Sequence, residues 1–231
     1  MRVLIGCESS GIIRDAFRKL GHDAYSCDLL PCEGDPTFHF QCDVRTLLKP
    51  GMWDLFICHP DCTYLTNSAA WAFGDGPYHQ KVKPGTLVGA DRRAAREEAL
   101  AFVREMMDAP VPHIAIENPV GVISTQIKPA SQYIQPHEYG DDASKKTGLW
   151  LKNLPLLRPT RSCPPRIVEW PKGSGKMVQR WSNQTDSGQN RLSPGADRWI
   201  ERSRTYQGWA EAMASQWGEY VQQAVEGREA A

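Results

Sequence analysis

The segment DLFICHPDCTYLT, residues 54–66, is an apolar run that ends at a reactive side chain. Residues 54–58 predict a short buried strand, and Cys62 follows it behind a proline. A similar segment, IAIENPVG at 114–121, predicts a strand over 113–116 that ends in a Glu-Asn-Pro turn. Ligands bind at the carboxyl ends of strands in an open parallel α/β sheet, so we expect Cys62 and Glu117 to meet in one crevice. A thiol nucleophile beside a carboxylic acid is a catalytic arrangement.

The flanking segments predict the rest of such a sheet. Residues 2–5 and 23–27 predict strands on either side of a helix at 12–20, a β-α-β unit near the minimum length for a parallel crossover. SQYIQPHEYG at 131–140 and KKTGLWL at 145–151 predict two more strands, the second in an antiparallel pair. The predicted fold class is therefore α/β, with a mostly parallel sheet that contains one antiparallel strand and is flanked by helices.

Helices and irregular segments complete this outline. Asp91 is expected to cap a helix over 92–107, and a final helix is expected to start near Ser203 or Thr205 and to end near Val225. Residues 30–41 predict a loop. Residues 63–91 follow Cys62, lack periodicity and contain several aromatic side chains, so we interpret them as a mobile lid.

Length and composition narrow the class of protein. The chain has 231 residues, 41% of them hydrophobic, which is enough for one sizeable core. It lacks an apolar run long enough for a membrane span, and its amino terminus, MRVLIGCES, lacks the pattern of a secretion signal. Seven cysteines, an odd number without regular spacing, favour a reducing compartment over a disulfide framework. We expect a cytoplasmic protein that has no membrane partner.

Charge is unevenly distributed along a chain whose net charge is zero. Residues 145–204 contain 13 Lys or Arg and 4 Asp or Glu, a local balance of +9, so the other residues carry −9. A basic segment on an otherwise acidic protein indicates a face that binds a polyanion. The alternative is a solvated surface whose sign varies by chance.

The loop GCESSG, residues 6–11, lies between the first strand and the first helix. Small residues let backbone amides approach a ligand, and a helix start favours a polar or anionic group. The loop is not GxGxxG, and the spacing from Cys7 to Arg14 is one residue too long for the phosphatase loop. Asp28 stands where nucleoside-binding α/β proteins place an acid for ribose hydroxyls, although a surface turn would equally explain it.

Cys62 and Glu117 also have structural explanations. Cys62 is equally a buried thiol, or part of a metal site with Cys58 and His59. The chain has no second Cys or His pair at the usual zinc spacing and neither motif of the zinc nucleobase deaminases, so we expect no metal. Glu117 is either a cap or a poorly solvated carboxyl, and burial would raise the pKa of such a carboxyl and suit it to general-acid work.

In order, and over nearly the whole chain, these motifs resemble the S-adenosylmethionine-dependent DNA cytosine-5 methyltransferases, specifically their short phage-type members. HPDCTYLT resembles the nucleophile loop, with Cys62 as nucleophile. IENPV resembles the ENV motif, with Glu117 as the acid and Asn118 supporting the loop. The resemblance implies a Rossmann-like class I methyltransferase sheet, S-adenosylmethionine as the cofactor, and a DNA substrate whose cytosine leaves the stack.

The remaining family motifs imply further site residues. The segment from Tyr139 to Thr147 resembles the Q-x-R-x-R region, with Lys145 at the first arginine and in a catalytic role. RLSP at 191–194, followed by Arg198, resembles R-x-L-T-P. DNA contacts are expected from Thr63, Tyr64, Lys146 and Arg191.

The resemblance also implies the residues around the cofactor. In the family an acid, here Asp43, contacts the adenine amino group. A glycine turn, here Tyr206-Gln207-Gly208, closes the cofactor site. The expected set is Gly6, Cys7, Glu8, Ser9, Ser10, Gly11, Asp28, Asp43, Val44, Pro60, Tyr206, Gln207 and Gly208.

The chain departs from the family pattern at several positions. Asp61 replaces the usual proline before the cysteine, and Thr63 replaces glutamine. Lys145 and Thr147 stand where arginines are expected, which leaves at most monodentate contacts there. Only about 40 residues separate KKTGLWL from RLSP, where the family has a target-recognition domain. We therefore expect slight sequence selectivity, or a protein partner that supplies it.

The resemblance to this family implies that the chain is organised in three parts. Residues 1–151 form the catalytic, cofactor-binding domain, 152–190 a small basic segment in place of the recognition domain, and 191–231 a helical region that completes the catalytic domain.

Two other functions stay open. One is the same chemistry on a free nucleotide, on RNA or with a modified donor. The other is a catalytically silent binding protein, such as a phage factor that blocks a host restriction system.

Overall fold

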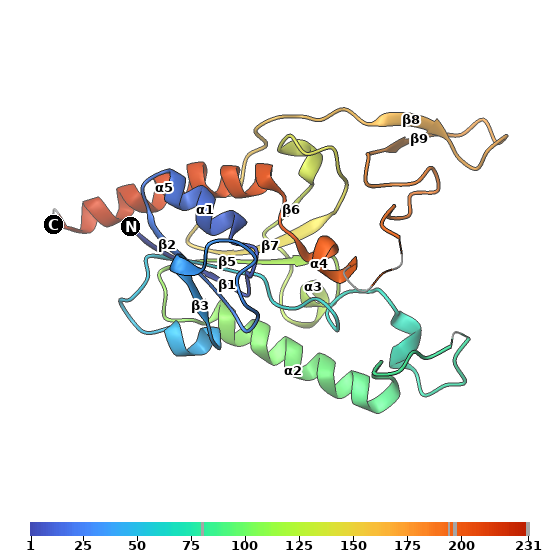
Figure 1. Ribbon diagram of the computed structural model, residues 1–231, viewed down its shortest axis with the longest axis horizontal. Helices are drawn as coiled ribbons and strands as arrows, with labels where there is room; N and C mark the ends of the chain where they lie inside the picture. The colour runs from blue at the N-terminus through green and yellow to red at the C-terminus, as the bar shows by residue number, and fades with distance from the viewer. Residues whose placement is uncertain (80, 194, 196–197, 230–231) are drawn as a thin grey trace.

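A computed structural model describes residues 1–79, 81–193, 195 and 198–229. Its main sheet has seven strands in the order β3-β2-β1-β4-β5-β7-β6 (Figure 1). All neighbouring pairs are parallel except those of β7, which runs antiparallel to both β5 and β6. The predicted fold class, a mostly parallel sheet with one antiparallel strand, is confirmed. The strands are β1 (Arg2–Gly6), β2 (Asp23–Asp28), β3 (His39–Gln41), β4 (Leu55–Cys58), β5 (His113–Pro119), β6 (Gln132–Ile134) and β7 (Thr147–Lys152).

Helices cover both faces of this sheet, which explains why its central strands are apolar along their whole length. On one face, α1 (Ile12–Lys19) and α5 (Gln207–Glu229) pack Phe17 and Trp217 against Val3 and Ile5. On the other, α2 (Gly89–Met107) and the short α3 (Ile123–Gln126) pack against Leu4 and its neighbours. Figure 1 shows α1 and α5 on one side of the strands and α2 on the other. Alternate side chains of β1 thus enter two separate cores.

The Glu-Asn-Pro segment is part of a strand, so the prediction of a turn there is wrong. β5 continues through Pro119 because β7 pairs with it residue by residue, with Asn118 opposite Gly148 and Pro119 opposite Thr147. The strand prediction stopped at 116 because polar residues and a proline follow. The antiparallel partner, which lies about 30 residues further along the chain, extends the strand.

Other boundaries also differ from the sequence-based expectations. Residues 30–41 contain a 3-10 turn, η1 (Pro36–Phe38), and the edge strand β3, which is too short for a periodic pattern. Asp91 lies in the first turn of α2 and not at its cap, because the helix begins at Gly89. The expected final helix is preceded by a separate one, α4 (Arg198–Ser203).

Two irregular segments flank the sheet. The segment 63–88 contains one turn of helix, η3 (Ala70–Phe73). The segment 152–190 contains a hairpin of β8 (Arg166–Glu169) and β9 (Met177–Arg180), which forms a sheet of its own and projects away from the main sheet (Figure 1). Further 3-10 turns are η2 (Val44–Leu47) and η4 (Pro136–Glu138). Within the described ranges, no helix is long and apolar enough to cross a membrane.

Candidate active site

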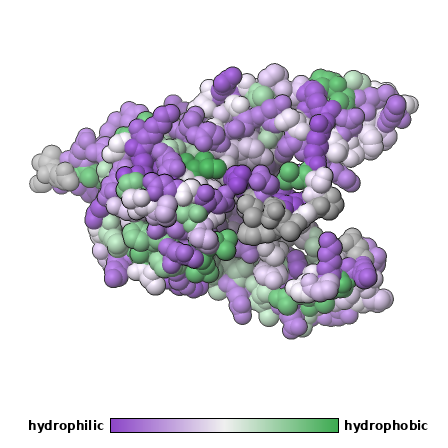
Figure 2. Space-filling model, in the orientation of Figure 1, coloured by the Kyte–Doolittle hydropathy of each residue, from purple (hydrophilic) through white to green (hydrophobic). Residues whose placement is uncertain are grey.

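A cavity of about 1550 Å³ lies at the carboxyl ends of β1, β4 and β5. β1 lies between β2 and β4. The connection after β1 leads to β2 on one side of it, and the connection after β3 leads to β4 on the other side. Open α/β sheets bind ligands at such a switch point. The cavity is bordered by the loops that follow β1, β2 and β4, by the start of the 63–88 segment and by residues 182–184 at the base of the hairpin. Figure 2 shows the surface hollowed between the hairpin and the η3 region.

The loop after β4 brings Cys62 into this cavity in a fixed conformation. Asn118 is buried at the end of β5, and its Nδ2 donates to the Pro60 carbonyl at 2.7 Å. The Cys62 carbonyl accepts from the amides of Leu65 and Thr66, both at 3.1 Å. Asn118 thus holds the strand-to-loop turn, and the Cys62 side chain is half-buried at its tip.

The charges around Cys62 act in opposite directions on its thiol. Burial raises the pKa of Cys62, and the carboxylates of Asp61 and Glu117 raise it further, while the ammonium of Lys145 lowers it. The net pKa lies above the ordinary value. Asp61 is itself held in place, because its Oδ1 accepts from the amide of Thr63 at 3.0 Å and from the Thr63 hydroxyl at 2.8 Å.

Glu117 lies in the same cavity, but its pKa is lowered, so the expectation of a raised value is wrong. Burial alone would raise the pKa, since the residue is 8% exposed. The hydrogen bond from His59 and the positive charges of Lys145 and His59 outweigh burial. The distance from His59 Nδ1 to Glu117 Oε2 is 3.1 Å. His59 and Lys145 are 58 and 28 residues from Glu117 in sequence, so the local pattern around Glu117 predicts the effect of burial alone.

His59 is the principal site residue that sequence reasoning missed. It came under consideration only as a zinc ligand, and no group of three His, Cys, Asp or Glu positioned for a metal occurs in the described part of the chain. Its Nε2 is buried without a hydrogen-bond partner among the described residues, while Nδ1 faces Glu117. The signal that could have identified it is its position, directly after β4 and three residues before Cys62.

The loop after β1 uses its acid internally. Glu8 is buried, and its carboxylate accepts from the amides of Ile13 at 2.8 Å and Arg14 at 3.4 Å at the start of α1. The anion site of this helix is therefore filled by the protein. Burial raises the pKa of Glu8, although His59 and these amides act in the opposite direction. Cys7, Ser9 and Ser10 line the cavity beside it.

The two glycines of that loop have structural roles and do not line the cavity. A Cβ on Gly6 would collide with the side chains of Phe56 and Val44. Gly11 has a φ of 72° and covers the guanidinium of Arg14, which is buried. Both positions require glycine to let the chain pack closely.

Two further acids line the cavity, each at the end of a local turn. Asp28 Oδ1 accepts from the amide of Leu30 at 2.9 Å. Asp43 accepts from the amide of Arg45 and pairs with its guanidinium, both at 2.9 Å. Val44 and Pro60 lie beside them in the cavity wall. This side of the cavity is thus acidic and partly apolar.

The later segments contribute Lys145 and Tyr206 to the cavity. Lys145 Nζ lies 6.0 Å from the centroid of the Tyr206 ring and 5.9 Å from that of Trp209. Gln207 and Gly208 do not line the cavity. The amide of Gly208 donates to Asp141 Oδ2 at 3.0 Å, and its Cα packs on the Tyr139 carbonyl, so this glycine serves the docking of α5.

All four residues expected to contact DNA border the cavity: Thr63, Tyr64, Lys146 and Arg191. Arg92, on α2, donates to the Thr63 carbonyl at 3.3 Å and lies over the ring of Tyr64. Pro194, the last residue of RLSP, lies outside the described residues.

Comparisons with known proteins add little to this geometry. No protein-family model and no curated protein matches the chain. One similar solved structure is a DNA modification methyltransferase encoded within an E. coli prophage, with 13% identity and a TM-score of 0.40, over 71% of this chain and 52% of that one. Another is DNMT2 of Spodoptera frugiperda, with 14% identity and a TM-score of 0.36, over 71% and 55%. The chain spans about half the length of these proteins, and the scores are too low to support a functional conclusion.

Proposed function

We propose that this protein transfers a methyl group from S-adenosylmethionine to carbon 5 of cytosine in DNA. The observation that carries the proposal is that Cys62 and Glu117, 55 residues apart in sequence, line one cavity together with Lys145, whose charge acts to lower the pKa of both. At about 1550 Å³ the cavity exceeds the roughly 300–1,000 Å³ typical of a single small ligand, so there is room for a nucleoside beside a cofactor.

The lining of the cavity fits this cofactor better than a phosphorylated one. Phosphate binds to free amides at a helix start, but Glu8 occupies those of α1. The acids Glu8, Asp28 and Asp43 instead suit a ligand that carries positive charge and hydroxyl groups. Asp28 would hold ribose hydroxyls, Asp43 and Val44 the adenine, and Ser9, Ser10 and Tyr206 the remainder. S-adenosylmethionine, when bound, supplies a methyl group on a positively charged sulfur.

Cys62 begins the proposed reaction, because cytosine carbon 5 is too weak a nucleophile until the ring is activated. The Cys62 thiolate adds to carbon 6, and ring nitrogen 3 takes up a proton from Glu117 as negative charge develops. Carbon 5 then becomes an enamine carbon able to accept a methyl group. Carbon 5 then loses its proton to solvent, Cys62 departs as the thiolate, and nitrogen 3 returns its proton to Glu117, which restores the ring.

The proton on nitrogen 3 comes from a pair of residues and not from Glu117 alone. A carboxyl with a lowered pKa is a poor proton store, but the imidazole of His59 is hydrogen-bonded to it. In the proposed reaction this pair supplies a proton to nitrogen 3 through Glu117 and takes it back when Cys62 departs. Lys145 lowers the pKa of both Cys62 and Glu117, so its charge favours the thiolate and the ionised pair.

The three-part organisation is part of the same proposal. Residues 1–151 and 191–231 supply the catalytic domain, with α5 closing one face of the sheet, and the basic segment 152–190 replaces a recognition domain. A base inside a duplex must leave the stack to reach Cys62, which costs a few kcal/mol. Lys146 and Arg191, which line the cavity, would hold the backbone of the flipped nucleotide.

The raised pKa of Cys62 favours a second candidate, a methyltransferase-like protein that binds DNA without modifying it.

The substrate of the proposed reaction is tested by incubating the protein with tritiated S-adenosylmethionine and, separately, with duplex DNA, RNA and dCMP. We expect label in duplex DNA, at carbon 5 of cytosine by nucleoside mass spectrometry. Label only in dCMP or RNA would refute the DNA substrate.

A covalent trap separates catalysis from silent binding. Duplex DNA that contains 5-fluorocytosine should form a stable adduct with the wild type and none with Cys62→Ser. Cys163→Ser is the matched control, because Cys163 is also half-buried but lies outside the cavity. Binding without an adduct by the wild type would favour the second candidate.

A further inference from the structure

The hairpin of β8 and β9 stands apart from the main sheet and has one exposed face. Ile167 pairs with Gln179 and Glu169 with Met177, so these four side chains share a face. Ile167 is 55% exposed and Met177 59% exposed, and Gln179 is also exposed. An isolated two-stranded hairpin is at best marginally stable, so this one needs a fixed base.

The base of the hairpin supplies that stability. Arg166 pairs with Asp186 at 2.7 Å and donates to the Gln184 carbonyl, also at 2.7 Å. Trp181, directly after β9, stacks on His137, with the ring centroids 4.0 Å apart and the planes inclined by 11°. The hairpin is therefore a braced arm on the body of the protein.

The same base is joined to the loop that carries Lys145. Ser144 and Asn183 exchange two hydrogen bonds, of 2.9 Å from the Ser144 amide and 3.0 Å from Asn183 Nδ2. The adjacent Ser182 amide donates to Asp142 at 2.9 Å. Because Lys145 follows Ser144, the arm and the catalytic lysine belong to one connected unit at the mouth of the cavity.

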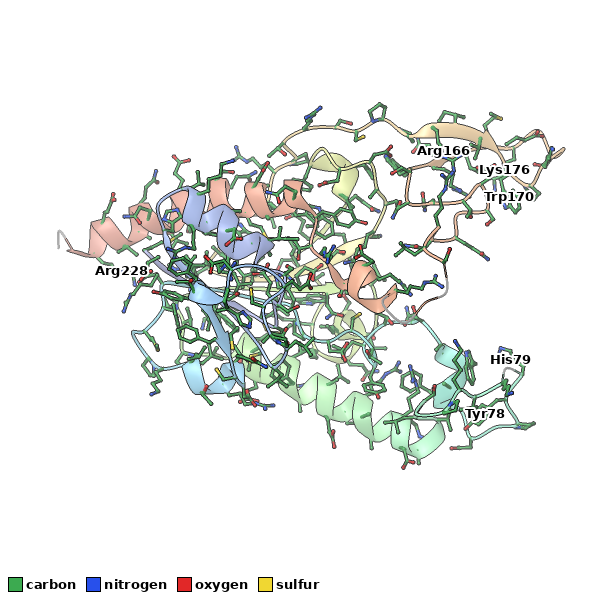
Figure 3. The ribbon with its side chains drawn as sticks, viewed as in Figure 1. Tyr78, His79, Arg166, Trp170, Lys176 and Arg228 are labelled. Atoms are coloured by element: carbon green, nitrogen blue, oxygen red, sulfur yellow. The ribbon has the colours of Figure 1, made fainter. Side chains whose placement is uncertain are left out.

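The turn of the arm is positively charged. Lys172 and Lys176 are exposed, and neither forms an ion pair with any residue in the ranges that the structure describes. The nearby acid, Glu169, accepts from the amide of Gly175 across the turn. Figure 3 shows Lys176, Trp170 and Arg166 on the arm, across the open side of the molecule from Tyr78 and His79.

We infer that the hairpin 166–180 is an arm that binds duplex DNA beside the target cytosine. This inference rests on the proposed function. A two-stranded ribbon fits the major groove of B-DNA, and the chemistry of the arm matches that environment. Lys172 and Lys176 contact phosphates, while the face of Ile167, Met177 and Gln179 contacts base edges. Apolar side chains suit the thymine methyl, and an amide suits adenine.

Binding to duplex DNA, measured by fluorescence anisotropy over a series of salt concentrations, tests the two lysines. Each phosphate contact contributes about −0.9 to the slope of log K against log salt, so K172A/K176A should flatten the slope by about 1.8 and weaken binding at low salt. K19A/K49A is the matched control, since both lysines are exposed and lie outside the cavity lining. It should bind like the wild type.

The exposed face is tested through sequence preference. Gln179→Ala should relax the preference for bases near the methylated cytosine in a pool of random duplexes, while Lys172 variants weaken all sequences alike. Thermal melting should show every variant folded like the wild type, because the altered side chains are exposed.

The outcomes separate this inference from the proposed function. Arm-dependent DNA binding without methyl transfer would leave the arm established and refute the reaction. Methyl transfer together with equal affinities and slopes for K172A/K176A and K19A/K49A would overturn the arm. Absence of duplex binding at low salt, or arm-dependent binding to phosphatidylserine vesicles in place of DNA, would also overturn it.

Discussion

At the residue scale, Asp61 is the departure that most affects the chemistry. Burial raises the pKa of the Cys62 thiol, and the carboxylate of Asp61 beside it raises that pKa further. Lys145 provides the opposing charge. Asp61 and Lys145 thus oppose each other at the thiol, and in the proposed reaction the identity of residue 61 should affect the rate of the first step.

We expect Asp61→Asn to lower the pKa of the Cys62 thiol. The substitution removes the negative charge but keeps the oxygen that accepts from Thr63, so the loop is retained. The rate of iodoacetamide alkylation at Cys62, followed by peptide mass spectrometry from pH 6 to 10, should reach half-maximum at lower pH than in the wild type. Asp108→Asn, an exposed residue directly after α2 and outside the cavity lining, is the control. An unchanged midpoint would show that Asp61 does not influence the thiol.

His59 decides the protonation state of Glu117 at the same scale. In His59→Gln the burial of Glu117 is opposed by Lys145 alone, so the pKa of Glu117 should rise above its wild-type value. The ¹³C resonance of the Glu117 carboxyl, assigned with Glu117→Gln, should titrate at higher pH. Loss of the proton supply should lower kcat by about 100-fold. A variant with wild-type kcat and an unshifted titration would remove His59 from the mechanism.

At the scale of elements, the last helix is positioned by one close contact. Gly208 lets α5 approach the Tyr139 carbonyl and the Asp141 carboxylate, and any side chain there would displace the start of the helix. That start lies next to Tyr206 in the cavity wall, so the packing of α5 and the shape of the site are connected.

Gly208→Ala should therefore destabilise the fold by about 1–3 kcal/mol, the usual range for overpacking. Gly227→Ala provides the comparison within the same helix, because a Cβ there meets nothing within 4 Å. It should stabilise the helix by about 0.5–1 kcal/mol, since alanine is the better helix former. Urea unfolding followed by circular dichroism measures both. Equal effects of the two substitutions would contradict the close contact.

At the scale of the whole molecule, the site is assembled from both ends of the chain. The loops after β1 and β2 meet the segment before α5, where Arg204 pairs with Glu33 at 2.7 Å. A ligand in the cavity contacts segments about 170 residues apart, so binding and global stability are linked.

A cofactor product, S-adenosylhomocysteine, should therefore raise the melting temperature. At a hundredfold excess over Kd the stabilisation is about 2.7 kcal/mol, or roughly 5–10 °C for a chain of this size. Differential scanning fluorimetry should show the shift in the wild type and a much smaller one in Asp28→Ala. Asp23→Ala, at the opposite end of β2, should behave like the wild type. A shift that Asp28→Ala fully retains would place the cofactor elsewhere.

Local patterns in the sequence were sufficient for the fold class and for the expectation that Cys62 and Glu117 lie in one cavity. Apolar runs that end in Cys62 and Glu117 predict adjacent strands, because strands buried on both faces are apolar throughout and parallel strands end at one edge. The roles expected of Asn118 and Lys145 followed only from the family resemblance. In the structure Asn118 Nδ2 donates to the Pro60 carbonyl, and Lys145 lines the cavity.

Properties that depend on distant partners required the tertiary structure. The pKa of Glu117 falls because His59 and Lys145 approach it from other strands, and β5 extends because β7 pairs with it. The hairpin within 152–190 is held by a stacked ring and an ion pair at its base, not by a periodic pattern. Sequence by itself determined the apolar runs of the central strands and that Cys62 and Glu117 lie near their carboxyl ends. Charge state, strand length and the braced arm arise from long-range contacts that no local pattern contains.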